Sequence, residues 1–339
     1  MKRILSLVLA AMLLLGACAF AVAEEPDTNK LVLYTSAGAK EYELIVNAFK
    51  EKYPNIDVEI VSGGTGEMAS RIRAEAAAPY GDVMMGGGNT IYRSIEDCLE
   101  PYRSVEADNL FKEFMPEDNL FTPCYINVNS IIVNKTQIKA LGVTVDGWES
   151  LCNPALKGKV SFANPADSGS ALEAIVNMLT AMSPSGKPED GWDFVTKFVE
   201  NLDGKFASGS SAAYKSVVEG EYPVGICNED KTISYMKDGA DVYAVYAVYA
   251  KEGITLRSSN IALMKGGANP KNAKLFIDFV VSKECQAAME AGVNTRPIRG
   301  DVPMTTEGRV PTSEIVQIAY PEVDSNEIKT HFQDVLTSF

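Results

Sequence analysis

The chain has a single histidine, His331, among its 339 residues, and it lacks the common catalytic motifs. A serine–histidine–aspartate triad would have to use this imidazole, yet no serine lies in a G-x-S-x-G nucleophile elbow. Neither the G-x-x-x-x-G-K-S/T loop that cradles nucleotide phosphates nor the H-E-x-x-H helix of zinc hydrolases occurs. Paired carboxylates leave a secreted hydrolase as an alternative. We predict a protein that is not an enzyme and needs no cofactor, with His331 at the surface or in packing.

Cysteine is scarce, and its spacing argues against a common metal site. The sequence has six cysteines and no C-x-x-C pair, which disfavours a zinc knuckle. Five of them follow the first 23 residues: Cys98, Cys124, Cys152, Cys227 and Cys285. An oxidising compartment permits disulfides, but an odd number leaves at least one thiol free or paired between chains. The pairing stays open.

The N-terminal apolar run, residues 4–15, is too short for a transmembrane helix, which needs roughly 20 apolar residues. It follows two basic residues and leads into small residues, which is the pattern of a secretory signal peptide. Ala21-Val22-Ala23 is an A-x-A cleavage site, so we predict that residues 1–23 are removed. Leu15-Gly16-Ala17-Cys18 also resembles a bacterial lipobox, which leaves lipid anchoring through Cys18 as an alternative. We expect an exported protein, periplasmic or extracellular.

The chain also has fewer basic than acidic residues. Lys and Arg number 31 against 45 Asp and Glu, a formal net charge of −14, and removal of residues 1–23 deletes two more positive charges. Such a surface repels nucleic acid and anionic lipid and favours solubility. We therefore expect no nucleic-acid partner. The total charge says little about a pocket, where local donors decide what binds.

Strand, turn and helix alternate through residues 31–88. The spacing of apolar residues predicts strands at 31–34, 56–61 and 82–85 and helices at 42–53 and 68–76. Each strand ends on a polar or glycine-rich turn. Three repeats of this unit indicate an α/β domain with a largely parallel sheet.

A second unit begins near residue 129, and the chain later returns to the first. Its predicted elements are a strand at 159–162, a polar turn at 164–170, helices at 172–179 and 192–202, and strands at 222–227 and 242–249. The last strand is apolar on both faces, so we place it inside a sheet. A strand at 259–264 and a helix at 273–281 then mark the return. This path favours two hinged lobes over tandem domains, and the length is typical of two domains.

Several short segments occur in a characteristic order: LVLYTS (31–36), AFKEKYP (48–54), GDV (81–83) with glycines 86–88, GKV (158–160), PADSGS (165–170) and the stretch 269–279. No single segment is specific. Their order and spacing, from about residue 31 to about residue 302, resemble those of the bacterial extracellular solute-binding proteins of ABC importers. Within that family the chain resembles the iron(III)-, sugar-phosphate- and aminoethylphosphonate-binding group.

This resemblance implies the type II periplasmic-binding-protein fold. Two α/β lobes, each a mostly parallel sheet flanked by helices, are joined by a hinge of crossing strands and close on a ligand. By the same resemblance, lobe 1 comprises residues 24–128 and 259–305, and lobe 2 comprises residues 129–258 and 306–339. The expected partners are a small-molecule ligand and the ABC-importer permease in the membrane, and the expected state is a monomer.

Three hydroxyl-bearing or glycine-rich turns follow predicted strands in lobe 1, and one precedes a helix in lobe 2. Ligands of open α/β sheets bind at the carboxyl edge, where free amides and positive helix ends attract anions. Plain N-capping explains each hydroxyl-bearing turn taken singly, but together on two lobes these turns predict ligand contacts. For glycines 86–88 the alternative to ligand contact is a turn that only needs a permissive backbone. Glycine in the last turn permits close approach of a phosphate-like group. The predicted residues are Thr35, Ser36, Gly63, Gly64, Thr65, Gly87, Ser168, Gly169 and Ser170.

Iron(III) binders of the resembled group carry adjacent tyrosines in the second lobe, because phenolate is a hard donor suited to that ion. The corresponding stretch here, residues 225–231, has no Tyr-Tyr pair. It offers Asn228, Glu229 and Asp230, whose oxygens accept hydrogen bonds from hydroxyls or pair with an ammonium. A solvated acidic turn that caps a helix is the alternative. We predict that these three residues contact the ligand and that no metal is bound.

The combined residues predict a ligand with a phosphate or phosphonate end and a hydroxyl- or amine-bearing end. Sugar phosphates and 2-aminoethylphosphonate both fit. Arg257 and Arg296 are expected in salt bridges, although either could reach the anion. The alternative within the same family is a ferric-iron binder that uses scattered tyrosines such as Tyr34, Tyr214 or Tyr235.

Overall fold

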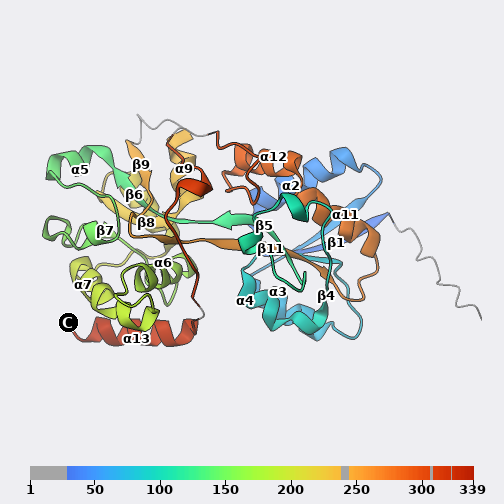
Figure 1. Ribbon diagram of the computed structural model, residues 1–339, viewed down its shortest axis with the longest axis horizontal. Helices are drawn as coiled ribbons and strands as arrows, with labels where there is room; N and C mark the ends of the chain where they lie inside the picture. The colour runs from blue at the N-terminus through green and yellow to red at the C-terminus, as the bar shows by residue number, and fades with distance from the viewer. Residues whose placement is uncertain (1–28, 238–243, 306–307, 322) are drawn as a thin grey trace, which may run out of the picture.

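The computed structural model describes residues 29–237, 244–305, 308–321 and 323–339. It shows two lobes side by side, joined by long strands that run from one lobe to the other (Figure 1). The predicted signal peptide, with both of its candidate processing sites, lies outside the described residues, as do the first two positions of the strand expected at 242–249. None of the described helices is long and apolar enough to cross a membrane.

Lobe 1 is built on a six-stranded sheet in the order β2-β1-β3-β11-β4, with β5 also paired to β11. Its strands are β1 (Lys30–Thr35), β2 (Asp57–Ser62), β3 (Val83–Met85), β4 (Leu99–Glu100), β5 (Thr122–Asn127) and β11 (Arg257–Met264). The expected parallel pairing is found for β2, β1 and β3, whereas β11 runs antiparallel to β3, β4 and β5. Its helices are α2 (Ala39–Lys52), α3 (Thr65–Ala74), α4 (Asn89–Ser94), α11 (Pro270–Val280) and α12 (Lys283–Val293).

Strand β1 is buried on both faces, which explains its continuous apolar sequence. Leu31 and Leu33 belong to one hydrophobic cluster together with Phe49 of α2. Val32 and Tyr34 point to the opposite face and belong to a second cluster that includes residues of α3. The helices thus cover both sides of the sheet, and the turns that follow β1, β2 and β3 are left at its carboxyl edge.

Lobe 2 is built on a four-stranded sheet in the order β7-β8-β6-β9. Its strands are β6 (Asn129–Asn134), β7 (Val160–Ser161), β8 (Val224–Asn228) and β9 (Val245–Val248). In the described part of this sheet β7, β8 and β9 share one direction, and β6, which enters directly from β5 after Val128, runs against both β8 and β9. The mostly parallel sheet expected for this lobe is therefore found, with β6 reversed among its described strands. Its helices are α5 (Lys135–Leu141), α6 (Gly169–Ala181), α7 (Trp192–Leu202), α8 (Ser210–Val218), α9 (Glu229–Lys237) and α13 (Ser325–Thr337).

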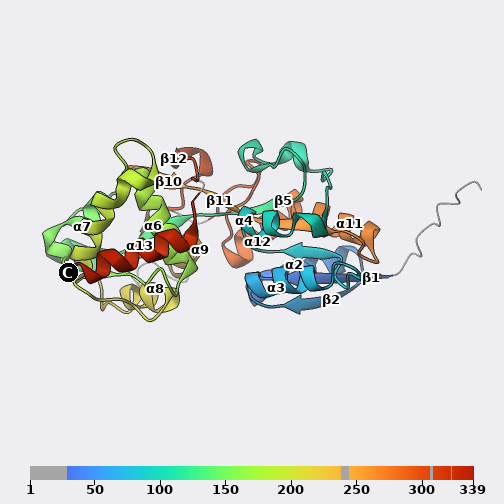
Figure 2. The same cartoon turned by 90° about the horizontal axis from the view of Figure 1, so that it is seen from below.

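Two continuous stretches of chain form the hinge, one from β5 into β6 and the other from β10 (Ile254–Thr255) into β11. The C-terminal segment returns to lobe 2, where β12 (Gln317–Ile318) pairs with β10 and α13 packs on α6 and α7 (Figure 2). Short 3-10 helices complete the fold: η1 (Glu96–Cys98), η2 (Ala107–Asn109), η3 (Lys112–Phe114), η4 (Glu149–Cys152), η5 (Pro154–Leu156), η6 (Pro188–Gly191) and η7 (Thr312–Glu314). The chain thus passes between the lobes near residues 128 and 256, at the ends of these strands.

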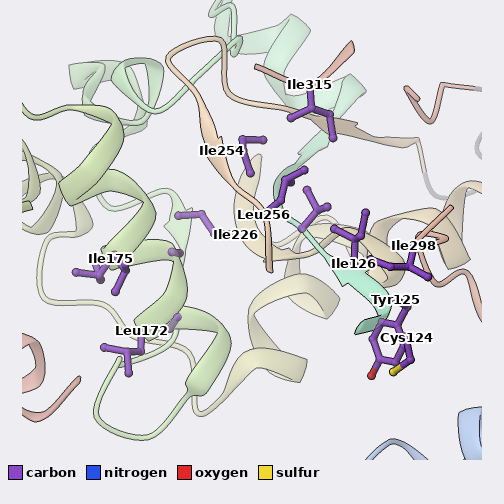
Figure 3. Close-up of a cluster of buried hydrophobic side chains, with 14 of the residues drawn as sticks. Cys124, Tyr125, Ile126, Leu172, Ile175, Ile226, Ile254, Leu256, Ile298 and Ile315 are labelled. Atoms are coloured by element: carbon purple, nitrogen blue, oxygen red, sulfur yellow. The ribbon is translucent and has the colours of Figure 1, made fainter. Parts of the chain in front are cut away.

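A hydrophobic core passes through the hinge. Ile126 of β5, Leu256 beside β11 and Ile298 belong to the same buried cluster as Ile175 of α6 and Ile226 of β8 (Figure 3). The crossing strands are thus held by packing as well as by backbone hydrogen bonds. This positions the carboxyl edges of the two sheets toward each other.

Candidate ligand-binding site

A cavity of about 550 Å³ lies where the two lobes meet the crossing strands. Its wall combines the start of α2 in lobe 1, the end of β5 and the start of α9 in lobe 2. Both helix ends carry amides without intrahelical partners and the positive end of the helix dipole. The lining residues are Gly38, Lys40, Glu41, Tyr125, Ile126, Asn127, Val128, Tyr214, Asn228, Glu229, Asp230, Lys231, Ser234, Tyr235, Gly292, Val293, Asn294, Thr295 and Arg296.

The predicted lobe 1 turns lie beside one another at the sheet edge. A Cβ atom on Gly86 would lie 2.6 Å from Ser36 Oγ, and one on Gly87 would lie 2.7 Å from Thr65 Cγ2. Both glycines have positive φ values, +101° and +84°, so the turn needs glycine for its backbone as well as for space. The Gly63 amide donates to the Thr35 carbonyl at 3.1 Å, which ties the second turn to the first. Gly38, which follows the first turn, lines the cavity, whereas the predicted residues Thr35, Ser36, Gly63, Gly64, Thr65 and Gly87 are not among its described lining residues.

Two of the predicted lobe 1 residues are engaged locally. The buried Thr35 hydroxyl accepts a hydrogen bond from the Ala37 amide at 3.1 Å, and the Gly64 amide donates to the Glu67 carboxylate at 3.3 Å. The Ser36 hydroxyl oxygen, in contrast, is buried and has no hydrogen-bond partner among the described residues. Ser36 thus has free hydrogen-bonding capacity.

The predicted lobe 2 turn combines a helix cap with a link to the cavity. Ser168 Oγ accepts from the Ala171 amide at 3.3 Å and so caps α6, while Ser170 Oγ lies 3.2 Å from Ser168 Oγ. The Ser170 carbonyl accepts from the Asn129 amide group at 3.4 Å, and Asn129 pairs across the sheet with Asn228, which lines the cavity. Ser168, Gly169 and Ser170 do not occur among the described lining residues. They adjoin the cavity through Asn129.

Arg257 lies between the predicted turns of lobe 1 and the predicted turn of lobe 2. Its Nη1 atom lies 2.8 Å from Glu173 Oε1 in the first turns of α6 and would lie 3.7 Å from a Cβ atom on Gly88 in lobe 1. Arg257 also stands opposite Asn127, a cavity residue, in the β11–β5 pairing, so both side chains leave the hinge on the same face. Burial raises the pKa of Glu173, and the charge of Arg257 opposes that shift. The expected salt bridge is present, and the guanidinium lies between the lobes.

Glu229 lines the cavity, but both of its oxygens are already used. Oε2 lies 3.1 Å from Arg296 Nε and 3.0 Å from Arg309 Nη2, and Oε1 accepts from Arg296 and from the Tyr249 hydroxyl. Arg309 also pairs with Glu290 at 3.3 Å. Burial alone would raise the pKa of Glu229, but the two arginines outweigh it and hold that pKa below its usual value. We therefore assign Glu229 to the hinge, whereas Asn228 and Asp230 line the cavity without contacting these arginines.

The structure also adds a residue that sequence reasoning missed. Glu41, in the first turn of α2, lines the cavity with a buried Oε1 atom that has no hydrogen-bond partner within the part of the chain that the structure describes. Burial raises its pKa to about 7. A glutamate in a first helical turn is ordinarily a surface residue that favours the helix dipole, so no sequence signal set it apart.

The candidate metal ligands are dispersed. Tyr34 is fully buried in lobe 1 and donates to Glu75 at 2.7 Å, whereas Tyr214 and Tyr235 line the cavity with ring centroids 6.1 Å apart. His331 stacks on Trp192 at 3.9 Å in lobe 2, as packing rather than as a ligand. No group of three His, Cys, Asp or Glu residues suited to a metal occurs within residues 29–237, 244–305, 308–321 and 323–339.

Comparisons with known proteins agree with this architecture. A family model described as bacterial extracellular solute-binding protein matches residues 45–311. A putative 2-aminoethylphosphonate-binding periplasmic protein of Salmonella typhimurium is 26% identical over 298 residues, which cover 85% of each chain. An uncharacterized protein of Haemophilus influenzae is 26% identical over 266 residues, covering 76% of this chain and 74% of that protein.

Two solved structures share the fold. The periplasmic binding protein AfuA from Actinobacillus pleuropneumoniae, with exogenous fructose-6-phosphate bound, superimposes with a TM-score of 0.70 at 24% identity, covering 91% of this chain and 97% of AfuA. Iron-bound HitA from Pseudomonas aeruginosa superimposes with a TM-score of 0.71 at 20% identity, covering 91% and 98%. The predicted type II periplasmic-binding-protein fold is thereby confirmed.

Proposed function

Because the chain belongs to the bacterial extracellular solute-binding protein family, whose members are periplasmic transport proteins of ABC importers, we propose that it captures a small organic solute bearing a phosphate or phosphonate group. The solute binds in the cleft between the lobes and is delivered to the permease. The protein is exported by its signal peptide, acts as a monomer and performs no chemistry on its cargo.

The position of Arg257 carries the anionic part of this proposal. Its guanidinium lies between Gly88 in lobe 1 and the first turns of α6 in lobe 2. Arginine binds phosphate oxygens with two parallel hydrogen bonds, and the first turn of α6 adds free amides and a positive dipole. Ser36 and Ser170 supply hydroxyls from the two lobes. An oxyanion held there contacts both lobes at once.

The other end of the cleft is suited to a hydroxyl or an amine. Asn228 and Asp230 face the cavity from lobe 2, and Glu41 faces it from lobe 1. Contacts from both lobes favour the closed state, since a ligand shifts a two-state equilibrium only through its differential affinity for the two states. The relatives named for 2-aminoethylphosphonate and the structure with fructose-6-phosphate support this ligand class.

A thermal-shift screen tests the proposal. Ligand that binds only the folded state stabilises it by about 2.7 kcal/mol at a hundredfold excess over Kd. We expect fructose 6-phosphate, glucose 6-phosphate or 2-aminoethylphosphonate to raise the melting temperature, and unphosphorylated glucose to leave it unchanged. A rise with phosphate-free sugars alone would overturn the anionic site.

Ferric iron is the second candidate, because Tyr214 and Tyr235 both line the cavity. A phenolate–iron complex absorbs visible light. The same screen therefore includes ferric citrate, with an absorption spectrum recorded after removal of excess metal. We expect a colourless protein, and a coloured one that loses its absorption in a Tyr214→Phe/Tyr235→Phe variant would replace the phosphate proposal with iron.

A further inference from the structure

Glu41 is the acidic group of the cleft whose charge the protein leaves uncompensated. Among the other charged lining residues, Glu229 is paired with Arg296, and Asp230 lies 2.5 Å from Lys231. Lys40, on the same helix as Glu41, is exposed. The Oε1 atom of Glu41 is buried and has no hydrogen-bond partner in the described ranges of the chain.

An unpaired carboxylate with a buried oxygen is costly to keep charged, because the protein interior does not replace the hydration it loses. The groups that surround Glu41 do not remove this cost. Burial is the main cause that raises its pKa to about 7, and Asp230 of α9 reinforces the shift. The Tyr125 hydroxyl of β5, Lys231 of α9 and a backbone hydrogen bond from Gly38 oppose the shift without cancelling it. Burial raises the pKa of the nearby Cys124 thiol of β5, so this thiol stays neutral and adds no second negative charge.

Resting on the proposed function, we propose that Glu41 is a specificity-determining residue that pairs with a primary ammonium of the ligand. The solute is then an aminoalkyl phosphonate or an amino-bearing phosphate ester, and not a sugar phosphate. A sugar hydroxyl would give Oε1 a hydrogen bond but would leave its negative charge without a counter-ion. An ammonium supplies both, and hydrogen bonds between charged groups are the stronger kind.

This assignment also gives the ligand a defined orientation. The anionic end lies toward Arg257 and the first turn of α6, and the ammonium lies toward the start of α2. The two ends of a zwitterion then contact different lobes, so only a ligand with both charges bridges the cleft. A phosphonate without the amine keeps the first contact and loses the second.

The test uses two ligands of matched shape, 2-aminoethylphosphonate and propylphosphonate, in which a methyl group replaces the ammonium. Isothermal titration calorimetry compares the wild type with Glu41→Gln, which keeps the size of the side chain and removes its charge. Glu43→Gln, at an exposed position of the same helix, is the matched control. We expect the wild type and Glu43→Gln to prefer the amine by about tenfold or more, which is the size of a charge-assisted hydrogen bond. Glu41→Gln should lose this preference and bind propylphosphonate as the wild type does.

The pH dependence provides a second readout. Glu41 must be ionised to pair with the ammonium, so the preference for the amine should be full at pH 8 and fall at pH 6, below the pKa of about 7. The ammonium lowers the pKa of the phosphonate that carries it, so the two ligands titrate differently, and the wild-type ratio is compared with the ratio in Glu41→Gln at each pH. The difference between the two ratios should grow from pH 6 to pH 8, and an equal pH dependence in both proteins would overturn the role of Glu41.

Each outcome separates this inference from the proposed function. Equal affinity of the wild type for both phosphonates, or equal losses for both in Glu41→Gln, overturns the role of Glu41 and leaves the anionic site standing. Ethanolamine and putrescine are included as phosphorus-free amines. Binding of these amines alone, dependent on Glu41, would overturn the phosphate proposal and retain Glu41. Failure of every probe to bind overturns both.

Discussion

Arg296 and Glu229 form a buried two-point ion pair across the boundary between the lobes. Arg296 Nε lies 3.1 Å from Glu229 Oε2, its Nη2 atom contacts Oε1, and the side chains are 0% and 3% exposed. Asn294 strengthens the same junction by donating to Ser234 of α9 at 2.8 Å. The start of α9 is thus fastened to the segment that follows α12, and this contact orients one wall of the cleft relative to the other.

Neutralising Glu229 is expected to destabilise the whole fold. The change Glu229→Gln leaves Arg296 and Arg309 buried beside a neutral partner, and removal of one member of a buried ion pair costs about 3–5 kcal/mol. Urea unfolding measures the loss. The control is Glu284→Gln, whose exposed pair with Lys52 is worth about 1 kcal/mol or less. Equal unfolding free energies for the two variants would contradict a stabilising role of the cluster.

The same cluster predicts how stability depends on pH. The pKa of Glu229 is lower in the folded protein than in the unfolded chain, so its contribution is present above the unfolded value of about 4.3 and is lost as the pH falls through the folded pKa. The wild type should therefore lose more stability than Glu229→Gln does as the pH falls from about 5 to about 2. Parallel losses would show that other carboxylates dominate acid unfolding.

Removing Arg257 is expected to weaken binding of phosphates and phosphonates at least about tenfold, the value of a hydrogen bond to a charged group. The single change Arg257→Met would leave Glu173 without its ion-pair partner, so the informative variant is Arg257→Met with Glu173→Gln. Arg103→Met, which removes an exposed pair with Asp108, is the control. Calorimetry measures the affinity, and circular dichroism checks the fold. Unchanged affinity in a folded double variant would place the anion elsewhere.

The serines at the start of α6 are expected to serve both folding and binding. Ser168→Ala with Ser170→Ala should weaken anion binding and also lower stability by about 1 kcal/mol, because Ser168 caps the helix. Ser282→Ala removes a cap of the same 3.3 Å geometry from α12, away from the cleft. It should cost similar stability and leave affinity unchanged. Normal affinity in the double variant would reduce this turn to a helix cap.

Local sequence patterns predicted most of the helices and strands but not the position of every strand in its sheet. The helix expected at 192–202 is found at Trp192–Leu202, because its apolar spacing and its burial agree. The strand expected inside the lobe 2 sheet is instead the edge strand β9, and of its four residues only Val245 is fully buried. Apolar residues on both faces do not distinguish a central strand from an edge strand that is covered by a helix.

For the candidate site, too, the sequence predicted some features and missed others. Turn chemistry predicted Ser36, Thr65 and Ser170 as ligand contacts, but strand ends and helix starts select small polar residues in any context, and these contacts stay a prediction. The sequence could not distinguish the roles of Glu229 and Glu41, because two glutamates in first helical turns look alike in sequence. In the folded protein Glu229 pairs with two arginines from distant segments, whereas Glu41 lines the cavity.

The sequence by itself determined the α/β character of the chain, the order of its elements and the turns that bring hydroxyls to the sheet edges. These features depend on hydrophobic periodicity and backbone preference, which are properties of neighbouring residues. Only the tertiary structure decided which charges are paired and which are left for a ligand. Electrostatic pairing depends on distances between residues as far apart as Glu229 and Arg309, and those distances exist only after the chain has folded.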